Sequence, residues 1–414
     1  MSEGSIDIAD EAPKDGPPVS GMRNDPSELS RATHVNAKLR FSVKISLMLG
    51  LGVLVGIYAL GLIQFIRGKA TVRLDIFGIW SWARFEIEQG PARIYDHAAQ
   101  SAYLHSLDPN IHNQMLFPYP PPYLMLIRPL GWLSFPAAWA SWSGGTLALL
   151  IVMLALVGRP ERGRTVLVAL LAPAIVVNLL YGQNGFLTAA LVVGGIGLAP
   201  SRPALGGFFL GLLLYKPQLA LLVGVALIAG RLWRAAYIAV LTVIAVVATS
   251  IVAFGVEPWI AWMNSLPEFL AQLDADRQHL TSLMPTAFAE ALWLGAGDHL
   301  AFVAQSAVTS VAVVGVAFAF HRKADRPSAA VLAVGTILAT PYAFLYDLPL
   351  VAAGAALFIG ERWSSLSVTQ VVVLEAALFV PLGMLLDMLP PVATVLHLVL
   401  FAMLLLPVMA SSHA

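Results

Sequence analysis

Residues 217–254 read PQLALLVGVALIAGRLWRAAYIAVLTVIAVVATSIVAF. The stretch consists of two apolar runs, 217–230 and 234–254, that meet at Arg231-Leu-Trp-Arg234, and these two arginines are its charged residues. A helix on the surface of a soluble protein needs a polar face toward water. A helix in a bilayer does not, because lipid replaces water around its side chains. The stretch therefore predicts two membrane-spanning helices joined by a short basic loop.

The composition of the whole chain agrees with this prediction. Of 414 residues, 58% are hydrophobic and 12% are charged, whereas soluble domains carry about 25% charged residues. The formal net charge is zero, so no overall field attracts nucleic acid. The absence of cysteine excludes disulfides and thiolate metal sites. We expect an all-α polytopic integral membrane protein whose partners include membrane lipids and no nucleic acid.

Apolar runs elsewhere in the chain predict about twelve crossings. They lie at 42–66, 120–157, 165–181, 186–200, 204–216, 217–230, 234–254, 301–320, 328–341, 344–360, 366–387 and 391–410. The run 120–157 is too long for one helix, and Leu133-Ser-Phe-Pro136 interrupts it. Residues 1–40 are polar and contain four prolines, which predicts a disordered tail. Residues 41–410 form the predicted transmembrane domain, in which Gly207 and Gly211 fit a helix-packing face.

Arginines and lysines in short loops predict the orientation, because such residues concentrate on the cytoplasmic side. Most fall on one side of this map: Lys38, Arg40, Lys44, Arg159, Arg162, Arg164, Arg202, Arg231, Arg234, Arg322, Lys323, Arg326 and Arg362. Both termini are then cytoplasmic, and two long segments, about 67–119 and 255–300, are outside. Their aromatic residues predict interfacial helices at headgroup level: Trp80, Trp82, Phe85, Tyr95 and Tyr103, then Trp259, Trp262 and Trp293.

Five polar segments fall on the predicted outer side. They are Asp75, Phe117-Pro-Tyr-Pro-Pro-Pro122, Tyr181-Gly-Gln-Asn184 with Asn178, Tyr215-Lys-Pro217, and Thr340-Pro-Tyr-Ala-Phe-Leu-Tyr-Asp347. The orientation was set by basic residues elsewhere, so the convergence is an independent observation. Polar groups at a membrane are costly unless partnered, and they indicate a functional site.

The residue types suggest roles at such a site. Asp75 can accept a proton from a sugar hydroxyl, and Lys216 is a point charge suited to a phosphate. Gln183 and Asn184 can bind hydroxyl groups. Tyr342 and Tyr346 can stack on a sugar ring or line a lipid chain.

Structural interpretations stand beside these roles. Asp75 can cap a helix, Lys216 can extend toward headgroups, and Asp347 can pair with a neighbouring cation. Gly182-Gln-Asn184 fits a tight turn by its chemistry alone. The nine histidines show no metal-ligand spacing, and no glycine loop is followed by a nucleotide-binding lysine, so we expect no metal and no cofactor.

The order of the motifs resembles glycosyltransferase family 87, polytopic enzymes of the GT-C fold class. The resemblance rests on Leu74-Asp-Ile-Phe77, Ile94-Tyr-Asp96, Phe117-Pro-Tyr-Pro-Pro121, Tyr181-Gly-Gln-Asn184, Gly211-Leu-Leu-Leu-Tyr-Lys-Pro217 and Thr340-Pro-Tyr342. Ala343-Phe-Leu-Tyr-Asp347 departs from the family, whose members often carry a histidine there.

The resemblance implies an inverting transfer of a hexose, usually mannose, from a polyprenyl-phosphate sugar to a lipid or glycan acceptor. It implies a bacterial inner membrane with the active site facing the periplasm. It implies that Asp75 is the catalytic base and that Lys216 lies at the donor phosphate. The other residues expected to bind substrate are Arg73, Tyr119, Tyr181, Gln183, Asn184, Tyr342, Tyr346 and Asp347.

Two other classes of function fit the same composition. A transporter or flippase of a lipid-linked sugar also has many spans and scattered intramembrane charge, often with inverted repeats, and no such repeat is evident in the sequence. A non-catalytic envelope scaffold would have large outer segments, but it would leave the clustered Asp and Lys without a purpose.

Overall fold

A computed structural model describes residues 75–109, 116–385 and 392–410. The predicted tail 1–40, the predicted first span 42–66 and Arg73 lie outside these residues. Within the described ranges the chain forms helices, turns and loops and no strand. The predicted all-α class is therefore confirmed for this part of the chain.

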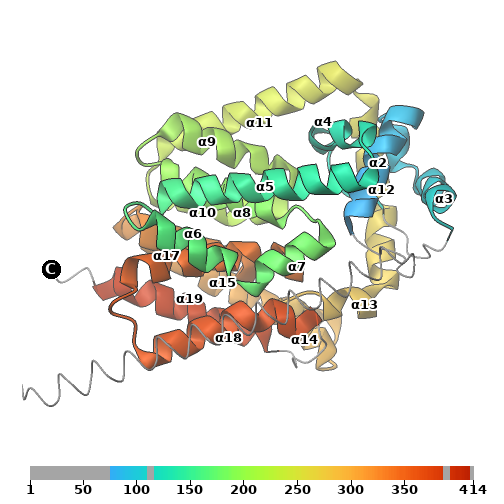
Figure 1. Cartoon of the computed structure of the whole chain (residues 1–414). Helices are drawn as coiled ribbons and strands as arrows, with labels where there is room; N and C mark the ends of the chain where they lie inside the picture. Colours follow the sequence, from blue (N-terminus) through green and yellow to red (C-terminus); the bar gives the residue numbers. More distant parts are fainter. Residues whose placement is uncertain (1–74, 110–115, 386–391, 411–414) are drawn as a thin grey trace, which may run out of the picture. The chain divides into compact units, whose positions relative to one another are not determined.

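The helices follow the apolar runs of the sequence (Figure 1). The described part of the predicted first outer segment forms α2 (Asp75–Gln89), η1 (Arg93–Tyr95) and α3 (His97–Leu107), and α4 (Pro122–Ile127) and η2 (Arg128–Trp132) follow it. Next come α5 (Phe135–Val157), α6 (Arg162–Leu170), α7 (Pro173–Tyr181), α8 (Gly185–Leu198), α9 (Pro203–Gly211), η3 (Leu212–Tyr215), α10 (Pro217–Ala229) and α11 (Trp233–Phe254). The second outer segment forms α12 (Glu257–Ala275), α13 (Arg277–Ser282) and α14 (Ala287–Trp293). The chain continues with α15 (Asp298–Arg322), α16 (Arg326–Leu338), η4 (Leu345–Asp347), α17 (Pro349–Arg362), α18 (Val368–Leu385) and α19 (Ala393–Ala410).

The long run 120–157 is broken where the sequence predicts it. The short helix α4 is followed directly by η2, which ends at Trp132. Helix α5 then begins at Phe135, with Ser134 as its N-cap and Pro136 in its first turn. Proline is tolerated there because the first N–H groups of a helix have no intrahelical partner. The run therefore holds one long apolar helix preceded by two short ones.

The number of long apolar helices is smaller than the predicted number of crossings. Five described helices are long and apolar enough to cross a membrane: α5, α11, α15, α18 and α19. The pair α6–α7, bent by 57°, would make a sixth. Four further apolar elements are shorter, and α8 with its 14 residues spans only about 21 Å, against about 30 Å for a hydrocarbon core. The count of about twelve crossings is not confirmed.

Helix α8 is the most enclosed element of the described bundle. Apart from Gly197, every one of its residues is buried. It contacts α5, α9, α16 and α17. The turn that precedes α8 is therefore held firmly in place.

The glycines on α9 allow its close contact with α11. A Cβ at Gly207 would lie 2.4 Å from the Ala235 carbonyl oxygen, and one at Gly211 would lie 2.6 Å from that of Ala239. Any larger side chain would push the two helices apart. The predicted helix-packing role of these glycines is confirmed.

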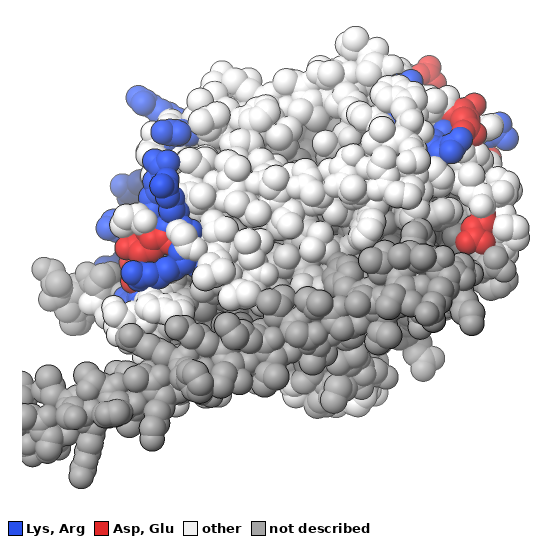
Figure 2. Space-filling model, viewed as in Figure 1, with Lys and Arg blue, Asp and Glu red and all other residues white. Residues whose placement is uncertain are grey.

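Basic side chains gather at one end of the described helices. Figure 2 shows lysines and arginines concentrated there, whereas acidic and basic side chains are mixed at the opposite end. Arg326 connects three of the loops at the basic end, because its guanidinium donates to the Gly158 carbonyl and pairs with Glu161 and Glu361. The described basic segments near residues 159–164, 322–326 and 362, which the sequence assigns to one side, thus lie together.

Four of the five aromatic residues expected at headgroup level in the first outer segment are buried within the protein, so their side chains are core residues. Trp80, Trp82, Phe85 and Tyr95 are each at most 8% exposed. They pack against rings from neighbouring segments, as when Trp82 and Tyr95 contact Phe117. Tryptophan and tyrosine suit a headgroup layer and a core equally well, so composition could not separate the two. In the second outer segment, by contrast, Trp293 is 62% exposed.

Candidate active site

Asp75 is the first residue of α2 that the structure describes. Its Oδ2 atom accepts a hydrogen bond of 2.9 Å from Nε2 of Gln183. Burial raises the pKa of Asp75 to about 6, and the bond from Gln183 opposes part of that rise. The carboxylate is partly exposed, and a pKa raised in this way suits a general base.

The turn between α7 and α8 presents Gln183 to Asp75. Gly182 ends α7 in the left-handed conformation, with φ of 63°, and a Cβ there would lie 2.4 Å from Cβ of Ile76. At the other end of the turn, a Cβ on Gly185 would lie only 1.9 Å from the carbonyl oxygen of Tyr346. The turn is therefore packed tightly between the start of α2 and the segment that precedes α17.

Asn184 points the other way, into a buried layer of hydroxyl groups. Its Nδ2 atom donates to the hydroxyls of Tyr119 at 2.9 Å and Tyr123 at 3.3 Å. The ring of Tyr123 stacks on Tyr215 at 5.4 Å, and the Tyr215 hydroxyl lies 2.7 Å from Oγ1 of Thr188. This layer connects three of the five predicted segments behind Asp75.

Lys216 and Asp347 form a buried ion pair. The Lys216 Nζ atom lies 2.6 Å from Oδ1 of Asp347, and the two side chains are 6% and 3% exposed. The other carboxylate oxygen accepts a bond of 3.2 Å from the backbone N–H of Phe344. Nζ also lies 5.5 Å from the ring centroid of Tyr346.

Tyr181 and Tyr346 form the accessible side of the cluster next to Asp75. Both are partly exposed, and their ring centroids are 6.2 Å apart. Tyr346 also stacks on Phe344 at 5.2 Å. Burial, followed by the charges of Asp347 and Asp75, raises the pKa of Tyr346 well above its usual value. Its hydroxyl therefore stays protonated and can donate a hydrogen bond.

The structure brings the five predicted polar segments into contact. Hydrogen bonds join Asp75 to Gln183, Asn184 to Tyr119 and Lys216 to Asp347, and the Tyr181 and Tyr346 rings, 6.2 Å apart, connect the first of these groups to the last. Tyr342 is the exception among the described predicted residues, because its ring packs near Phe288, at 6.1 Å, in a separate pocket.

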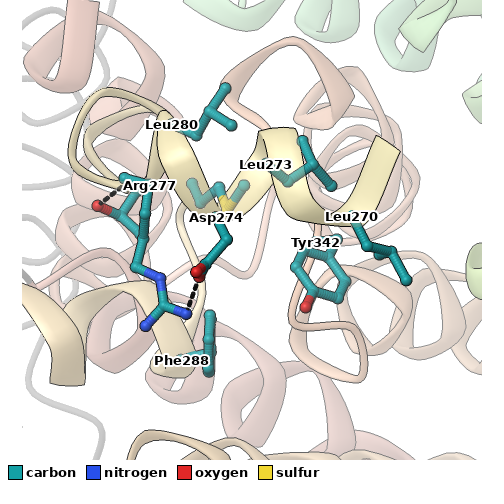
Figure 3. Close-up of a pocket in the computed structure, with 9 residues that line it drawn as sticks. Leu270, Leu273, Asp274, Arg277, Leu280, Phe288 and Tyr342 are labelled. Carbon is teal, nitrogen blue, oxygen red and sulfur yellow. Dashed lines mark hydrogen bonds and ion pairs between the residues drawn. The ribbon is translucent and has the colours of Figure 1, made fainter. Parts of the chain in front are cut away.

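That pocket lies against α12 and α13 (Figure 3). Leucines from both helices, together with Met284, Phe288 and Tyr342, form its apolar wall. Arg277 lies at one side and pairs with Asp274 and Asp298. The arginine is 37% exposed, so the pocket combines a solvated charge cluster with an apolar surface.

Sequence reasoning missed Tyr123, Tyr215 and Thr188 as members of the buried hydroxyl layer. Tyr215 belongs to the Tyr-Lys-Pro motif. Thr188 lies four residues after Asn184, the N-cap of α8, which places Thr188 one helical turn away from it. These signals could have identified two of the three. For Tyr123, which follows three prolines in the first turn of α4, no local signal exists.

Comparison with known proteins assigns the chain to a family. The model of glycosyltransferase family 87 matches residues 117–345, more than half of the chain. The matched residues include the Gln183 turn and Lys216, whereas Asp75, Tyr346 and Asp347 lie outside them. No curated protein and no solved structure gives a significant match. The chain belongs to glycosyltransferase family 87 and is a membrane protein that transfers a sugar.

Proposed function

We propose that the protein transfers a hexose, with mannose as the first candidate, from a polyprenyl-phosphate sugar to a lipid or glycan acceptor. The observation that carries the proposal is the Asp75 carboxylate, partly exposed, oriented by Gln183 and with a pKa raised to about 6. Its surroundings come from five separate segments of the chain. In a GT-C type of helical scaffold, such a site would lie at the outer end of the helices.

The chemical step needs one base and one leaving group. The acceptor hydroxyl oxygen attacks the anomeric carbon while Asp75 takes its proton. The bond between that carbon and the phosphate oxygen breaks, and the phosphate leaves with the electron pair. Attack from the side opposite the leaving group inverts the configuration. No other reactant is required.

Tyr181 and Tyr346 are the residues we propose to contact the donor. Both lie close enough to Asp75 for its charge to raise their pKa, and their rings, 6.2 Å apart, offer flat surfaces for a sugar. The Tyr346 hydroxyl, held protonated, can donate to a sugar or phosphate oxygen. The prediction that Lys216 binds the donor phosphate stays a prediction, and its contact with Asp347 favours another role.

We propose that this end of the protein faces the periplasm across a bacterial inner membrane. The basic side chains gather at one end of the described helices (Figure 2), and basic loops are typical of the cytoplasmic side. The α7–α8 turn lies at the ends of its helices away from the loops that carry Arg162 and Arg202.

The test is a transfer assay with purified protein in proteoliposomes, polyprenyl-phosphate mannose and a lipid extract. Asp75→Asn keeps the shape of the side chain but cannot take a proton, so we expect transfer to fall by about 10²–10⁴-fold. Asp276→Asn, an exposed aspartate, is the matched control and should retain activity.

Equal transfer by Asp75→Asn and wild type would eliminate Asp75 as the base. Absence of transfer with every polyprenyl-phosphate hexose, together with movement of the donor between leaflets, would identify a flippase instead.

A further inference from the structure

We infer that Lys216 and Asp347 are a positioning pair, which holds Tyr346 and the Gln183 turn against Asp75, and that Lys216 is not a ligand of the donor phosphate. The inference rests on the proposed function, because it takes Asp75 as the base. It assigns to Lys216 and Asp347 an action through other residues rather than contact with substrate.

The first argument is that both charges are already bound. One oxygen of Asp347 accepts from Lys216 at 2.6 Å and the other accepts from the Phe344 N–H at 3.2 Å. With side-chain exposures of 6% and 3%, neither group faces solvent from which a phosphate could approach. A phosphate that captured Lys216 would leave a buried carboxylate without its cation, which is strongly unfavourable.

The second argument is the path from the pair to the base. Asp347 directly follows Tyr346, and its bond to the Phe344 N–H closes the short turn that carries the Tyr346 ring. The Tyr346 carbonyl rests on Gly185, with no room for even a Cβ between them. Gly185 is two residues from Gln183, which donates to Asp75. Movement of the 344–347 turn would therefore displace both the proposed sugar-stacking ring and the hydrogen bond to the base.

The third argument is the position of Lys216 in the chain. It precedes Pro217 at the start of α10, whereas Asp347 is 131 residues further on, just before α17. The pair thus connects two helices of the described bundle at the level of the site. Its ammonium lies over the Tyr346 ring at 5.5 Å and fixes that ring from behind.

A rescue experiment separates positioning from phosphate binding. Lys216→Gln alone leaves the Asp347 carboxylate buried without its cation. Asp347→Asn alone leaves the Lys216 ammonium group buried without its anion. In Lys216→Gln with Asp347→Asn, two neutral amides can bond to each other, and the Asn oxygen can still accept from the Phe344 N–H. We expect kcat to fall by at least about tenfold in each single variant and to recover to within about threefold of wild type in the double variant.

The KM for the donor should change little in the double variant. If Lys216 contacts the phosphate, the double variant will be as inactive as Lys216→Gln, or its donor KM will rise by about tenfold or more, since a charge-assisted bond is lost. Either outcome overturns the positioning role. Inactive wild-type protein would instead count against the proposed function.

A second measurement tests the pair without any activity. The chain has no cysteine, so Ala343→Cys introduces a single thiol at a fully buried position beside the turn. We expect a thiol reagent to label it about tenfold faster in the Lys216→Gln background than in the wild-type background, because the turn opens. Slow labelling should return when Asp347→Asn is added. Equal labelling in all three backgrounds would overturn the inference.

Discussion

Two clusters of opposite charges among the described residues differ in their surroundings. Lys216 and Asp347 are enclosed by protein, with 6% and 3% of their side chains exposed. Arg277 also binds carboxylates, Asp274 and Asp298, but these three side chains are between 37% and 62% exposed. Water can replace the partners of Arg277, whereas nothing in the described surroundings can replace those of Lys216. Removing one ion-pair partner is therefore expected to affect the protein strongly at Lys216 and Asp347 and only weakly at Arg277.

The largest difference should appear when one partner of each cluster is removed. Lys216→Met leaves a buried carboxylate unpaired and should destabilise the protein by about 3–5 kcal/mol. We expect thermal unfolding in detergent to show a marked fall in Tm and transfer activity to fall with it. An unchanged Tm would mean that water already reaches Asp347 and would remove the contrast with Arg277.

A second variant probes the packing around the buried pair. In Gly185→Ala the new Cβ would clash with the Tyr346 carbonyl, so the turn must shift, at a cost of about 1–3 kcal/mol. We expect a clear loss of transfer activity in the same assay. Gly144→Ala, where a Cβ meets no atom within 4 Å, is the control and should remain active. Full activity of Gly185→Ala would show that the turn need not be fixed.

The pH dependence of transfer tests the hydrogen bond from Gln183 to the base. Burial raises the pKa of Asp75 to about 6, so kcat/KM should fall about tenfold per unit as the pH drops below that value. Since the bond stabilises the charged carboxylate, Gln183→Leu should move the midpoint upward, by about one pH unit. A midpoint that stays in place or moves down would show that Gln183 does not act on Asp75.

The smallest effect is expected at the exposed cluster. Arg277→Gln removes two solvated ion pairs, which are worth at most about 1 kcal/mol each. We expect Tm to change little, with any change weakening further at high salt. A loss of activity with unchanged Tm would instead assign Arg277 to substrate binding, and would make the pocket of Figure 3 part of the active site.

Much of the fold follows from runs of similar residues. Within the described residues the predicted apolar runs are helical, although 165–181 and 204–216 are each divided between two helices, and the break at Leu133-Ser-Phe-Pro136 lies where proline and serine stand. The number of membrane crossings could not be predicted from the apolar runs, because α8 and its neighbours are apolar for a reason other than contact with lipid. Helix α8 is surrounded by other helices, and burial in protein selects the same side chains as burial in lipid.

The sequence predicted which residues belong to the candidate site better than it predicted their contacts. Asp75, Gln183, Asn184, Lys216 and Asp347 stand out in the sequence because polar residues are rare there. Asp75 and Gln183, however, are 108 residues apart, and no local pattern pairs them. The prediction that Tyr342 joins this group is not supported, since its ring lies beside Phe288 in the Arg277 pocket.

The sequence by itself determined that this is a helical membrane protein and which end of its helices carries the polar groups. These properties depend on hydropathy and on the alternation of helix direction, both of which are local or additive along the chain. Only the tertiary structure decided that Lys216 faces Asp347 and that Trp80 and Trp82 are core residues. It also decided that Asp75 is oriented by Gln183. Such contacts depend on which helices lie side by side, and a lysine has the same local sequence whether it meets a carboxylate, a phosphate or water.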